Sequence, residues 1–517
     1  WTCDLATYTC TGGEAATPPA GDAARSPDGR WAAFTRDHDL YARDTATGEE
    51  IRLTGDGAPH HDYAALPESR LSPITDRGVG KPLAPAVLWS PDSARLLTYR
   101  LDQRRVEPMH LLQSVPPPGT ARPVLHSYRY PLPGDEHLPL ATLLVIDLAT
   151  RRIVPLDLEP LAVVVRTPFE QKTVWWSADG ERIGIVNPAR SGRAIALQIA
   201  DAASGQVRAI LEEAGPTQVF PHHVQMESTN VREVGSGEEV IWYSARDGWG
   251  HLYLHDARTG AVKRQITAGA WTVRDIARID ADGRWVYFTA GGREEGRDPY
   301  YRHLYRAGLD NHSLELLTPE DAEHAVSFSP TGAYFVDTYS RIDQAPRAVL
   351  RAADGRLVST LEEADLGGLL ATGWRFPERF CVKARDGVTD IYGSIVRPTG
   401  FDPARRYPVL DAIYPGPQTI RTPKAFPDGG NNNFWQDQAL AELGFVIVTI
   451  DGRGTPYRAK TFHDFAYGAA FGEAGGLEDH IAALRQLAAR DRSLDLDRVG
   501  IYGHSGGGYA STRAMLR

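Results

Sequence analysis

The distribution of apolar and polar residues changes near residue 366. Before that point, short runs of alternating apolar and polar residues are separated by tight turns, a pattern typical of antiparallel strands joined by hairpins. After it, apolar runs of strand length alternate with amphipathic segments of helix length, which is typical of an α/β sheet. The sequence therefore predicts an all-β domain at residues 1–366 and an α/β domain at residues 367–517.

Similar tight turns recur along the first part. Turns at positions 29, 93, 180, 283 and 332 each precede a strand-like run. A four-stranded propeller blade takes roughly 40–50 residues, so these turns lie about one or two blades apart. We predict a β-propeller of about seven or eight blades, with its first part upstream of Trp1. A tandem array of β-sandwiches is the alternative, but the Cys and Trp spacing of immunoglobulin cores does not accompany the turns.

The residue pattern in the last third of the chain predicts a doubly wound α/β sheet. Strands are expected at residues 380–384, 391–396, 409–414, 445–450 and 497–502, and helices at residues 434–443, 475–489 and 506–516. In the second helix, four apolar side chains fall on one face: Leu477, Ile481, Leu484 and Ala488.

Residues 503–507 read Gly-His-Ser-Gly-Gly and lie between a predicted strand and a predicted helix. Gly-x-Ser-x-Gly at such a turn is the nucleophile-elbow pattern, in which glycines allow a sharp bend that exposes the serine hydroxyl. We expect Ser505 to be a nucleophile and the N–H of Gly506 to face an oxyanion. The alternative is a Gly/Ser-rich loop that matches the pattern by chance.

Composition narrows the function classes. The chain has 42% hydrophobic and 24% charged residues, a net charge of −10 and a pI near 5.9, which disfavour a nucleic-acid partner. No apolar run approaches the roughly 18 residues of a membrane span. The first residue is Trp1, so we expect the natural N-terminus to be missing or processed. These features do not determine the cellular compartment of the protein.

Three cysteines are too few for a disulfide scaffold; Cys3 and Cys10 could bridge across a hairpin or remain free thiols. No metal site is predicted, because the adjacent pairs His60-His61 and His222-His223 lack the i, i+4 spacing of a helical zinc pair. No phosphate-binding glycine loop precedes a Lys-Ser/Thr, and no cofactor is expected.

Several motifs together resemble the prolyl oligopeptidase family of serine peptidases, in particular its dipeptidyl-peptidase IV branch. In the last third they are Phe-Asp-Pro at 401–403, Tyr-Pro-Gly-Pro-Gln at 414–418, Asp-Gly-Arg-Gly at 451–454, and Gly472 with Glu478-Asp479. In the first part they are residues 246–253 and 300–305. The resemblance runs over the whole chain and implies an eight-bladed propeller that caps an α/β-hydrolase domain.

The resemblance also assigns roles. It implies cleavage of short peptides, often after proline or alanine, with Ser505 as the nucleophile. Tyr414 would donate its phenol O–H to the oxyanion beside the N–H of Gly506; the alternative for Tyr414 is a core tyrosine. The family places its catalytic acid and histidine after the nucleophile, and this sequence ends at Arg517. We therefore expect a hydrolase domain truncated after the elbow; an inactive protein is the alternative.

The same branch usually holds the substrate's α-amine with two glutamates on a short propeller helix, expected here between Tyr63 and Lys81. No adjacent glutamates stand there. A cationic amine in a partly dry pocket needs a carboxylate, so four acids are candidate substitutes: Glu68, Asp76, Glu294 and Glu295. The sequence does not distinguish two roles for the long segments 57–87 and 104–139: they are either arms that reach the active site or ordinary surface loops.

Three functions follow from these patterns. The first is a serine peptidase of the dipeptidyl-peptidase or aminopeptidase type, acting on short peptides near Pro or Ala through an acyl-enzyme. The second is an esterase or acyl-transfer hydrolase on the same scaffold. The third is a catalytically inactive propeller that binds peptides or partners. The sequence leaves open whether the protein forms a homodimer.

Overall fold

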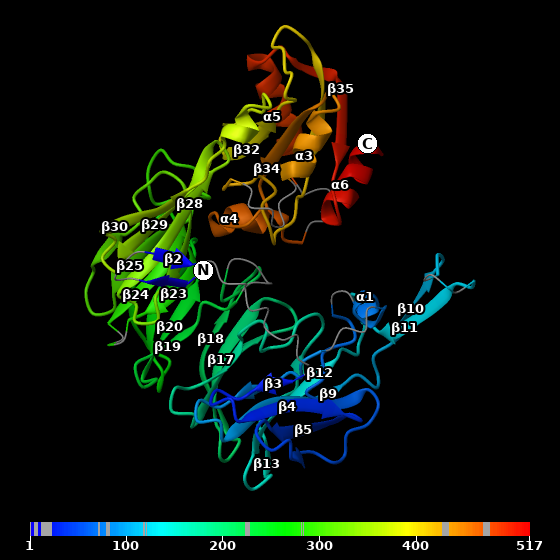
Figure 1. The fold of residues 1–517 in the computed structure, drawn as a ribbon, viewed down its shortest axis with the longest axis vertical. Helices are drawn as coiled ribbons and strands as arrows, with labels where there is room; N and C mark the ends of the chain where they lie inside the picture. Colours follow the sequence, from blue (N-terminus) through cyan, green and yellow to red (C-terminus); the bar gives the residue numbers. More distant parts are fainter. Residues whose placement is uncertain are drawn as a thin grey trace. The chain divides into compact units, whose positions relative to one another are not determined.

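The computed structural model describes residues 2–4, 9–11, 23–70, 73–78, 83–116, 119, 121–222, 228–280, 282, 284–426, 434–468 and 476–516. The chain forms two compact units. One consists of Trp1–Arg190 and Ala196–Glu212, and the other of Ser191–Ile195 and Glu213–Arg517. Figure 1 shows antiparallel sheets along most of the chain, with most of the helices near its C-terminal end.

The first unit is built from antiparallel sheets. One has the order β3 (Ala24–Arg25), β4 (Trp31–Arg36), β5 (Asp39–Asp44), β6 (Glu50–Arg52). Another has the order β13 (Ile153–Pro155), β12 (Leu140–Asp147), β9 (Arg95–Asp102), β7 (His61–Tyr63), with β14 (Leu161–Ala162) on β12 and β8 (Leu88–Trp89) on β9. A third, with most of its residues here, is β15 (Val174–Trp176), β16 (Arg182–Pro188), β17 (Ala194–Asp201), β18 (Val207–Ala214).

The first unit also contains a short helix and two separate hairpins. The two long segments noted in the sequence carry β7 with helix α1 (Pro73–Gly78), and the hairpin β10 (Pro108–Gln113) and β11 (Val124–Arg129). A further hairpin, β1 (Thr2–Asp4) and β2 (Thr9–Thr11), pairs Cys3 with Cys10 in register. The side chains of these two cysteines lie outside the described residues, and so does any bridge between them.

The second unit contains three more four-stranded sheets, each in chain order. They are β19 (Arg232–Val234), β20 (Glu239–Ser244), β21 (His251–Asp256), β22 (Val262–Gln265); β23 (Thr272–Ile279), β24 (Trp285–Gly291), β25 (His303–Gly308), β26 (Leu314–Leu316); and β27 (Glu323–Phe328), β28 (Tyr334–Arg341), β29 (Gln344–Ala352), β30 (Leu357–Glu363). Stacked aromatic rings lie on the β23–β26 sheet, with centroids 5.8 Å apart for Phe288 and Tyr305 and 6.3 Å apart for Trp271 and Phe288, and they share a buried cluster with Ile241 and Leu254 of the β19–β22 sheet.

The recurring turns are held by a serine and an aspartate two positions apart. Ser26 Oγ donates to Asp28 Oδ1 over 2.6 Å, and both oxygens accept backbone N–H groups of the turn. Gly29 has a φ of 73°, which favours glycine. The same bonds recur at residues 90–95 and 177–182. The sequence-predicted turns are thus confirmed at these places, and their geometry is local.

The C-terminal part of the second unit is a five-stranded sheet with the order β31-β32-β34-β33-β35. The strands are β31 (Glu378–Lys383), β32 (Asp390–Val396), β33 (Tyr407–Ala412), β34 (Val446–Asp451) and β35 (Leu494–Tyr502). β33 pairs in parallel with β34 and β35, whereas β32 pairs antiparallel with β31 and β34. Every residue of β34 is buried, as the apolar run at 445–450 predicted.

The sheet is contacted by helices α3 (Phe434–Ala441), α5 (Leu477–Arg490) and α6 (Gly506–Met515). The same part of the chain also has the short helices α2 (Gly367–Leu370) and α4 (Lys460–His463) and the 3₁₀-helix η1 (Asp464–Ala466). The predicted apolar face of α5 was wrong in one respect. Ile481 is 42% exposed, while His480, Ala483 and Leu487 are buried. The reason is that His480 is drawn toward the sheet by a hydrogen bond to Asp411. Gly472 and Gly475 lie outside the described residues.

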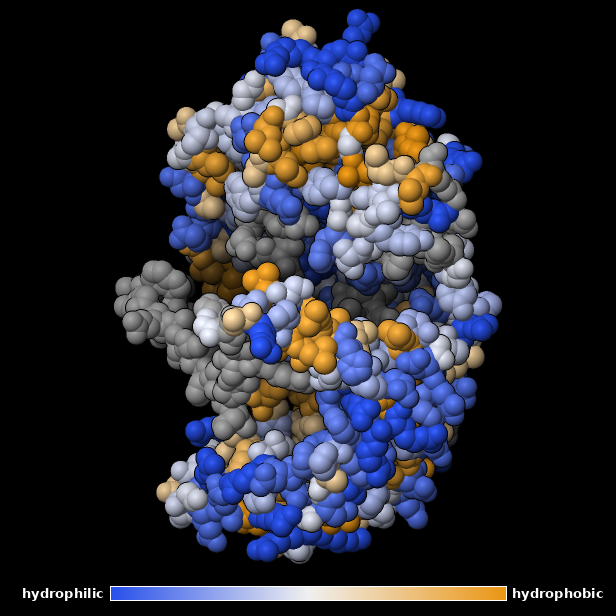
Figure 2. Space-filling model, turned by 90° about the vertical axis from the view of Figure 1, so that its right-hand side faces the viewer, coloured by the Kyte–Doolittle hydropathy of each residue, from blue (hydrophilic) through white to orange (hydrophobic). Residues whose placement is uncertain are grey.

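β35 is an edge strand of the five-stranded sheet. Val499 on this strand and Met515 on α6 are 45% and 78% exposed. In Figure 2, hydrophobic side chains gather over the upper part of the visible face, where Figure 1 places β35 and α6. None of the described helices is long and apolar enough to cross a membrane.

Candidate active site

Ser505 sits at the tight turn between β35 and α6. Its backbone has φ 53° and ψ −114°, a positive φ that residues other than glycine rarely adopt. Such a conformation costs roughly 1–3 kcal/mol and persists only where neighbours enforce it. Ser505 is exposed, and Gly506 after it is buried. The backbone therefore has the form expected of a nucleophile elbow.

Two glycines allow this turn to press against the end of β33. A Cβ built on Gly503 or on Gly507 would lie 2.3 or 2.2 Å from the carbonyl oxygen of Ile413. The same position on Gly507 would be 3.6 Å from the Cα of Tyr414. Tyr414 therefore borders the first turn of α6, where backbone N–H groups lack intrahelical partners. The structure brings Ser505, Gly506 and Tyr414 together.

The Tyr414 hydroxyl is held by Gln418. The Gln418 side-chain Nε2 donates to the phenol oxygen over 2.7 Å. The two side chains meet above Gly416, where a Cβ would lie 2.5 Å from Gln418 Oε1 and 2.6 Å from Tyr414 Cε1. Because the phenol oxygen accepts this bond, its own proton remains to be donated elsewhere. Gln418 was part of the motif read in the sequence, but its bond to Tyr414 was not foreseen.

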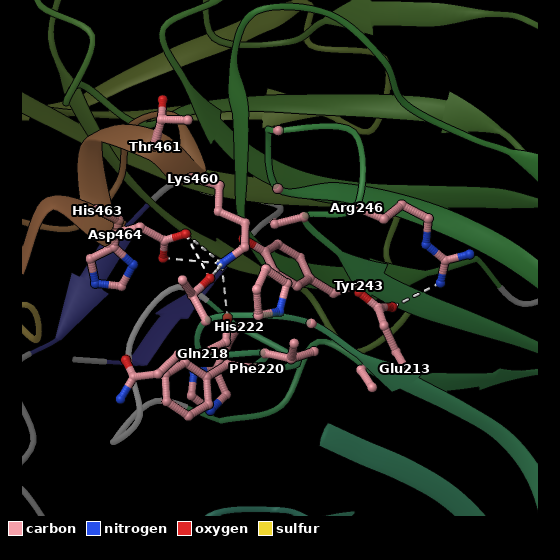
Figure 3. Close-up of a pocket in the computed structure, with 18 of the residues that line it drawn as sticks. Glu213, Gln218, Phe220, His222, Tyr243, Arg246, Lys460, Thr461, His463 and Asp464 are labelled. Atoms are coloured by element: carbon pink, nitrogen blue, oxygen red, sulfur yellow. Dashed lines mark hydrogen bonds and ion pairs between the residues drawn. The ribbon is translucent and has the colours of Figure 1, made fainter. Parts of the chain in front are cut away.

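The same loop is anchored from helix α4. His463 Nε2 donates to the Pro417 carbonyl oxygen over 2.8 Å. Burial lowers the pKa of His463, although the bond to Pro417 opposes that shift. Figure 3 shows His463 near Lys460 of this helix and near Asp464, which begins η1. The sequence alone assigned no role to His463, and its contact with Pro417 is visible only in the fold.

The four candidate amine-binding acids are divided between the two units. In the first unit, the two carboxylate oxygens of Glu68 are engaged by His60 Nδ1 and the Arg129 N–H, each at 2.8 Å. Asp76 lies on α1, within the stretch where a short helix was expected, and pairs with Arg70 at 3.8 Å. These two acids belong to one unit, whereas Ser505 belongs to the other.

Glu294 and Glu295 belong to the second unit. Glu294 accepts hydrogen bonds from the Tyr305 hydroxyl at 2.9 Å and from Arg293 at 3.0 Å, whereas Glu295 is exposed. Both line a pocket of about 210 Å³ together with Tyr457. The residues that line it do not include Ser505 or Tyr414, so the two glutamates and the elbow form different local groups.

A buried histidine–carboxylate pair joins helix α5 to strand β33 of the hydrolase-type sheet. His480 Nδ1 is 2.8 Å from both oxygens of Asp411. Burial works to lower the pKa of His480, but the charge and hydrogen bond of Asp411 outweigh it and raise the pKa overall. Among the described residues, no hydrogen bond joins this pair to Ser505, so it braces α5 against β33 rather than completing a triad.

The Asp-Gly-Arg-Gly segment at residues 451–454 also has a structural role. Arg453, from the Asp-Gly-Arg-Gly segment, makes a two-pronged ion pair with Asp479, with Nε–Oδ2 at 3.0 Å and Nη2–Oδ1 at 2.8 Å. Bidentate pairs of this kind fix geometry as well as charge. They hold the loop after β34 to the start of α5.

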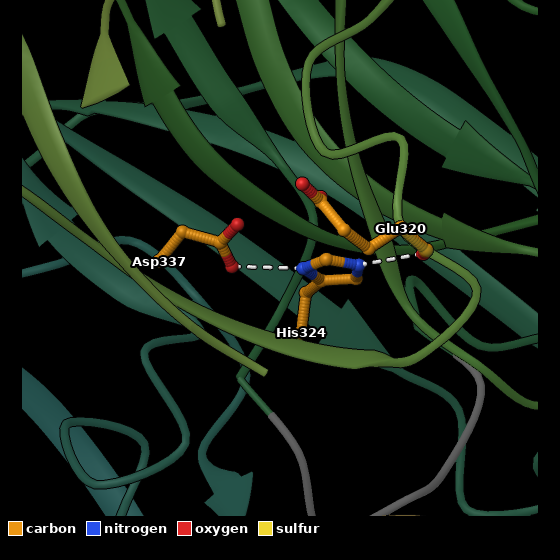
Figure 4. Close-up of side chains that lie close together, drawn as sticks. All are labelled: Glu320, His324 and Asp337. Carbon is orange, nitrogen blue, oxygen red and sulfur yellow. Dashed lines mark hydrogen bonds and ion pairs between the residues drawn. The ribbon is translucent and has the colours of Figure 1, made fainter. Parts of the chain in front are cut away.

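Glu320, His324 and Asp337 form a cluster of metal-ligating types in the second unit (Figure 4). His324 Nδ1 is 2.8 Å from Asp337, and Nε2 is 3.0 Å from the Glu320 carbonyl oxygen. Arg351 donates to both carboxylates. Because a guanidinium already compensates the acids and both histidine nitrogens are engaged, this cluster fits a structural network better than a metal centre.

Comparison with known proteins agrees with this architecture. Residues 1–68 and 83–346 match the family described as "Dipeptidyl peptidase IV (DPP IV) N-terminal region", and residues 431–517 match the "Prolyl oligopeptidase family". A crystal structure of Porphyromonas gingivalis dipeptidyl peptidase 4 superposes with a TM-score of 0.76 at 23% identity, covering 96% of this chain and 66% of that one. The shared fold is a propeller followed by an α/β-hydrolase sheet.

Sequence relatives point the same way. "Probable dipeptidyl-aminopeptidase B" of Aspergillus oryzae is 24% identical over 558 residues, covering 100% of this chain and 57% of that protein. Dipeptidyl peptidase 8 of Homo sapiens is 25% identical over 563 residues, covering 95% and 61%. The chain thus spans about three fifths of the length of these relatives. It belongs to the prolyl oligopeptidase family, in the dipeptidyl peptidase IV branch, as its motifs predicted.

Proposed function

We propose that this protein is a serine peptidase that removes dipeptides from the N-termini of short peptides, with a preference for Pro or Ala beside the scissile bond. The observation that carries the proposal is the strained, exposed Ser505 placed against the Tyr414 loop. Relatives named dipeptidyl peptidases support the substrate class.

In the proposed reaction, Ser505 Oγ attacks the scissile carbonyl carbon while a general base accepts the hydroxyl proton. The carbonyl oxygen becomes an oxyanion that accepts hydrogen bonds from the Tyr414 hydroxyl and the Gly506 N–H. The C–N bond then breaks, the base protonates the leaving amine, and an acyl-enzyme remains. Water, deprotonated by the same base, releases the dipeptide and restores Ser505.

The general base and its carboxylate partner are assigned to residues outside those that the structure describes. The known relatives are longer than this chain, so such residues are available in a protein of that length. We also assign residues 1–366 to a propeller of about eight blades and residues 367–517 to part of the hydrolase domain. The propeller would restrict entry to short or extended peptides.

The α-amine of the substrate requires a carboxylate. The candidates are Glu68, Asp76, Glu294 and Glu295. Changing each acid to its amide in the full-length protein would identify the partner, because its loss raises KM for dipeptide substrates and leaves an N-blocked ester unaffected. If none of the four changes does so, strict dipeptide release is contradicted.

A fluorophosphonate probe tests the core of the proposal on the full-length protein. We expect covalent labelling of Ser505, its loss in Ser505→Ala, and turnover of Ala-Pro anilide well above that of p-nitrophenyl esters. Faster ester than anilide turnover would favour the esterase or acyl-transfer alternative. Absence of any adduct at Ser505 would favour a non-catalytic peptide-binding propeller.

We further propose that two copies associate through the β10–β11 hairpin. Leu112 and Leu125 face each other in register and are 62% and 63% exposed, and adjacent apolar side chains this exposed are typical of contact surfaces. Light scattering should give a dimer that Leu112→Asp converts to a monomer. A monomer at every concentration would contradict the assignment.

A further inference from the structure

A pocket of about 410 Å³ lies in the second unit between helix α4 and two loops of the propeller-type sheets (Figure 3). The loops are residues 215–222, after β18, and 245–250, after β20; Glu213 at the end of β18 also lines the pocket. The Lys460 N–H donates to the Gly248 carbonyl oxygen over 2.8 Å, and Lys460 Nζ donates to Thr217 Oγ1 over 2.7 Å. Helix α4 is therefore attached to both loops, and the pocket has preformed walls.

Most charged groups in the pocket wall neutralise each other. Glu213 pairs with Arg246 at 2.8 Å, and Lys460 pairs with Asp464 at 3.0 Å. The remaining cation, Arg458, donates to the Asp390 carbonyl oxygen and stacks over the Phe462 ring at 4.8 Å. Among the described residues, no carboxylate that lines the pocket is left to hold an amine.

One polar side chain in the wall stands out. His222 is 8% exposed, and its Nδ1 makes no hydrogen bond with any residue that the structure describes. Its ring stacks on Phe220 with centroids 5.7 Å apart and an interplanar angle of 5°. Burial lowers the pKa of His222 to about 4, so the imidazole is neutral at pH 7. A buried polar atom without a partner is costly, and a ligand group would satisfy it.

The pocket borders the loop that carries Tyr414. His463 lines it and bonds to Pro417, three residues beyond Tyr414. Three extended residues span at most about 11 Å, and a bound peptide strand advances about 3.3 Å per residue. The stretch of loop from Tyr414 to the pocket is therefore no longer than about three residues of an extended substrate. Because no described carboxylate in the pocket wall is left for the cationic α-amine of a substrate, the segment that enters the pocket lies on the leaving-group side.

We propose that this pocket is a subsite for the leaving-group side of peptide substrates, and that it takes an uncharged peptide segment a few residues past the scissile bond. The segment's polar group bonds to His222, and its side chain packs on Phe220 and Tyr243. This inference rests on the proposed peptidase function, because it deepens the substrate assignment of the same site.

The test compares two substrates in the full-length protein: Ala-Pro-Ala-amide and Ala-Pro-Ala-Ala-Leu-Ala-amide. We expect kcat/KM to be at least 10-fold higher for the longer one. His222→Phe keeps the stacked ring but removes the nitrogen, and Ala245→Trp fills the pocket; both should bring the ratio close to 1. Ala404→Trp, on an exposed turn, is the matched control and should leave the ratio unchanged. A ratio unaffected by both pocket variants overturns the proposal.

A binding experiment distinguishes failure of this inference from failure of the proposed peptidase reaction. Acetyl-Ala-Ala-Leu-Ala-amide, which carries no charge, is titrated calorimetrically into Ser505→Ala protein with and without Ala245→Trp, whose folding is checked by its melting curve. Binding that Ala245→Trp abolishes supports the pocket even if the anilide is never hydrolysed, in which case only the peptidase function fails. Binding of the free acid but not the amide would make this a carboxylate site and overturn the proposed ligand class.

Discussion

The hydrogen bond from Gln418 to Tyr414 allows a sharp test of the oxyanion assignment. Glu has the shape of Gln, but an ionised carboxylate cannot donate to the phenol oxygen. In Gln418→Glu the carboxylate would instead accept the Tyr414 proton across the present 2.7 Å contact. The hydroxyl would then be turned away from the substrate.

The expected magnitude follows from that contact. A hydrogen bond to a charged group is worth about 1.5–3 kcal/mol, and it must break before Tyr414 can serve the oxyanion. At about 1.4 kcal/mol per tenfold change in rate, kcat should fall about 10- to 100-fold with little change in KM. The upper end approaches the roughly 10²–10³ lost when a whole oxyanion donor is removed.

The pH profile adds a signature that a packing defect lacks. Once it is protonated, the carboxyl group introduced by Gln418→Glu can donate again, so activity relative to wild type should recover as the pH falls toward the ordinary Glu pKa of about 4.3. The assay is kcat for Ala-Pro anilide, from pH 4 to 8, in the full-length protein. Gln418→Met, which cannot take the proton, is the control and should show a smaller loss without recovery.

A double-mutant cycle shows whether Gln418 acts through Tyr414. On a Tyr414→Phe background, Gln418→Glu should have almost no further effect, because no hydroxyl is left to capture. Equal losses on both backgrounds, or an effect on KM alone, would refute the reasoning. Gln418 would then contribute only to the shape of the loop.

Three more predictions concern the scaffold. Gly507→Ala places a Cβ about 2.2 Å from Ile413 O, so fluorophosphonate labelling should be lost, whereas Gly508→Ala, with its nearest atom at 3.3 Å, should keep most of it. Lys424→Met leaves Asp298 and Asp451 without their buried cation and should destabilise the second unit by about 3–5 kcal/mol in urea unfolding; an unchanged midpoint would contradict this. The raised pKa of His480 means that its pairing with Asp411 stabilises fully below the unfolded pKa of about 6.5 and loses this contribution as pH rises through the folded pKa. Melting temperatures from pH 5 to 9 should show this slope, and His480→Gln should abolish it.

Local features of this protein could be predicted from sequence because they depend on neighbours in the chain. The turn at Ser26 and Asp28 closes through atoms two positions apart, and the bend at Ser505 requires the glycines beside it. The apolar run at 445–450 predicted a fully buried strand, and β34 is one. The family resemblance rested on motifs of the same local kind.

Contacts between distant segments were settled only by the tertiary structure. Asp411 and His480 are 69 positions apart, and their hydrogen bond decides which face of α5 meets the sheet. Lys424 and Asp298, separated by 126 positions, join the loop after β33 to the loop between β24 and β25. His463 reaches Pro417 across 46 positions. Residue spacing specifies strand, helix and turn, but the partner of a buried charge depends on which elements the chain folds side by side.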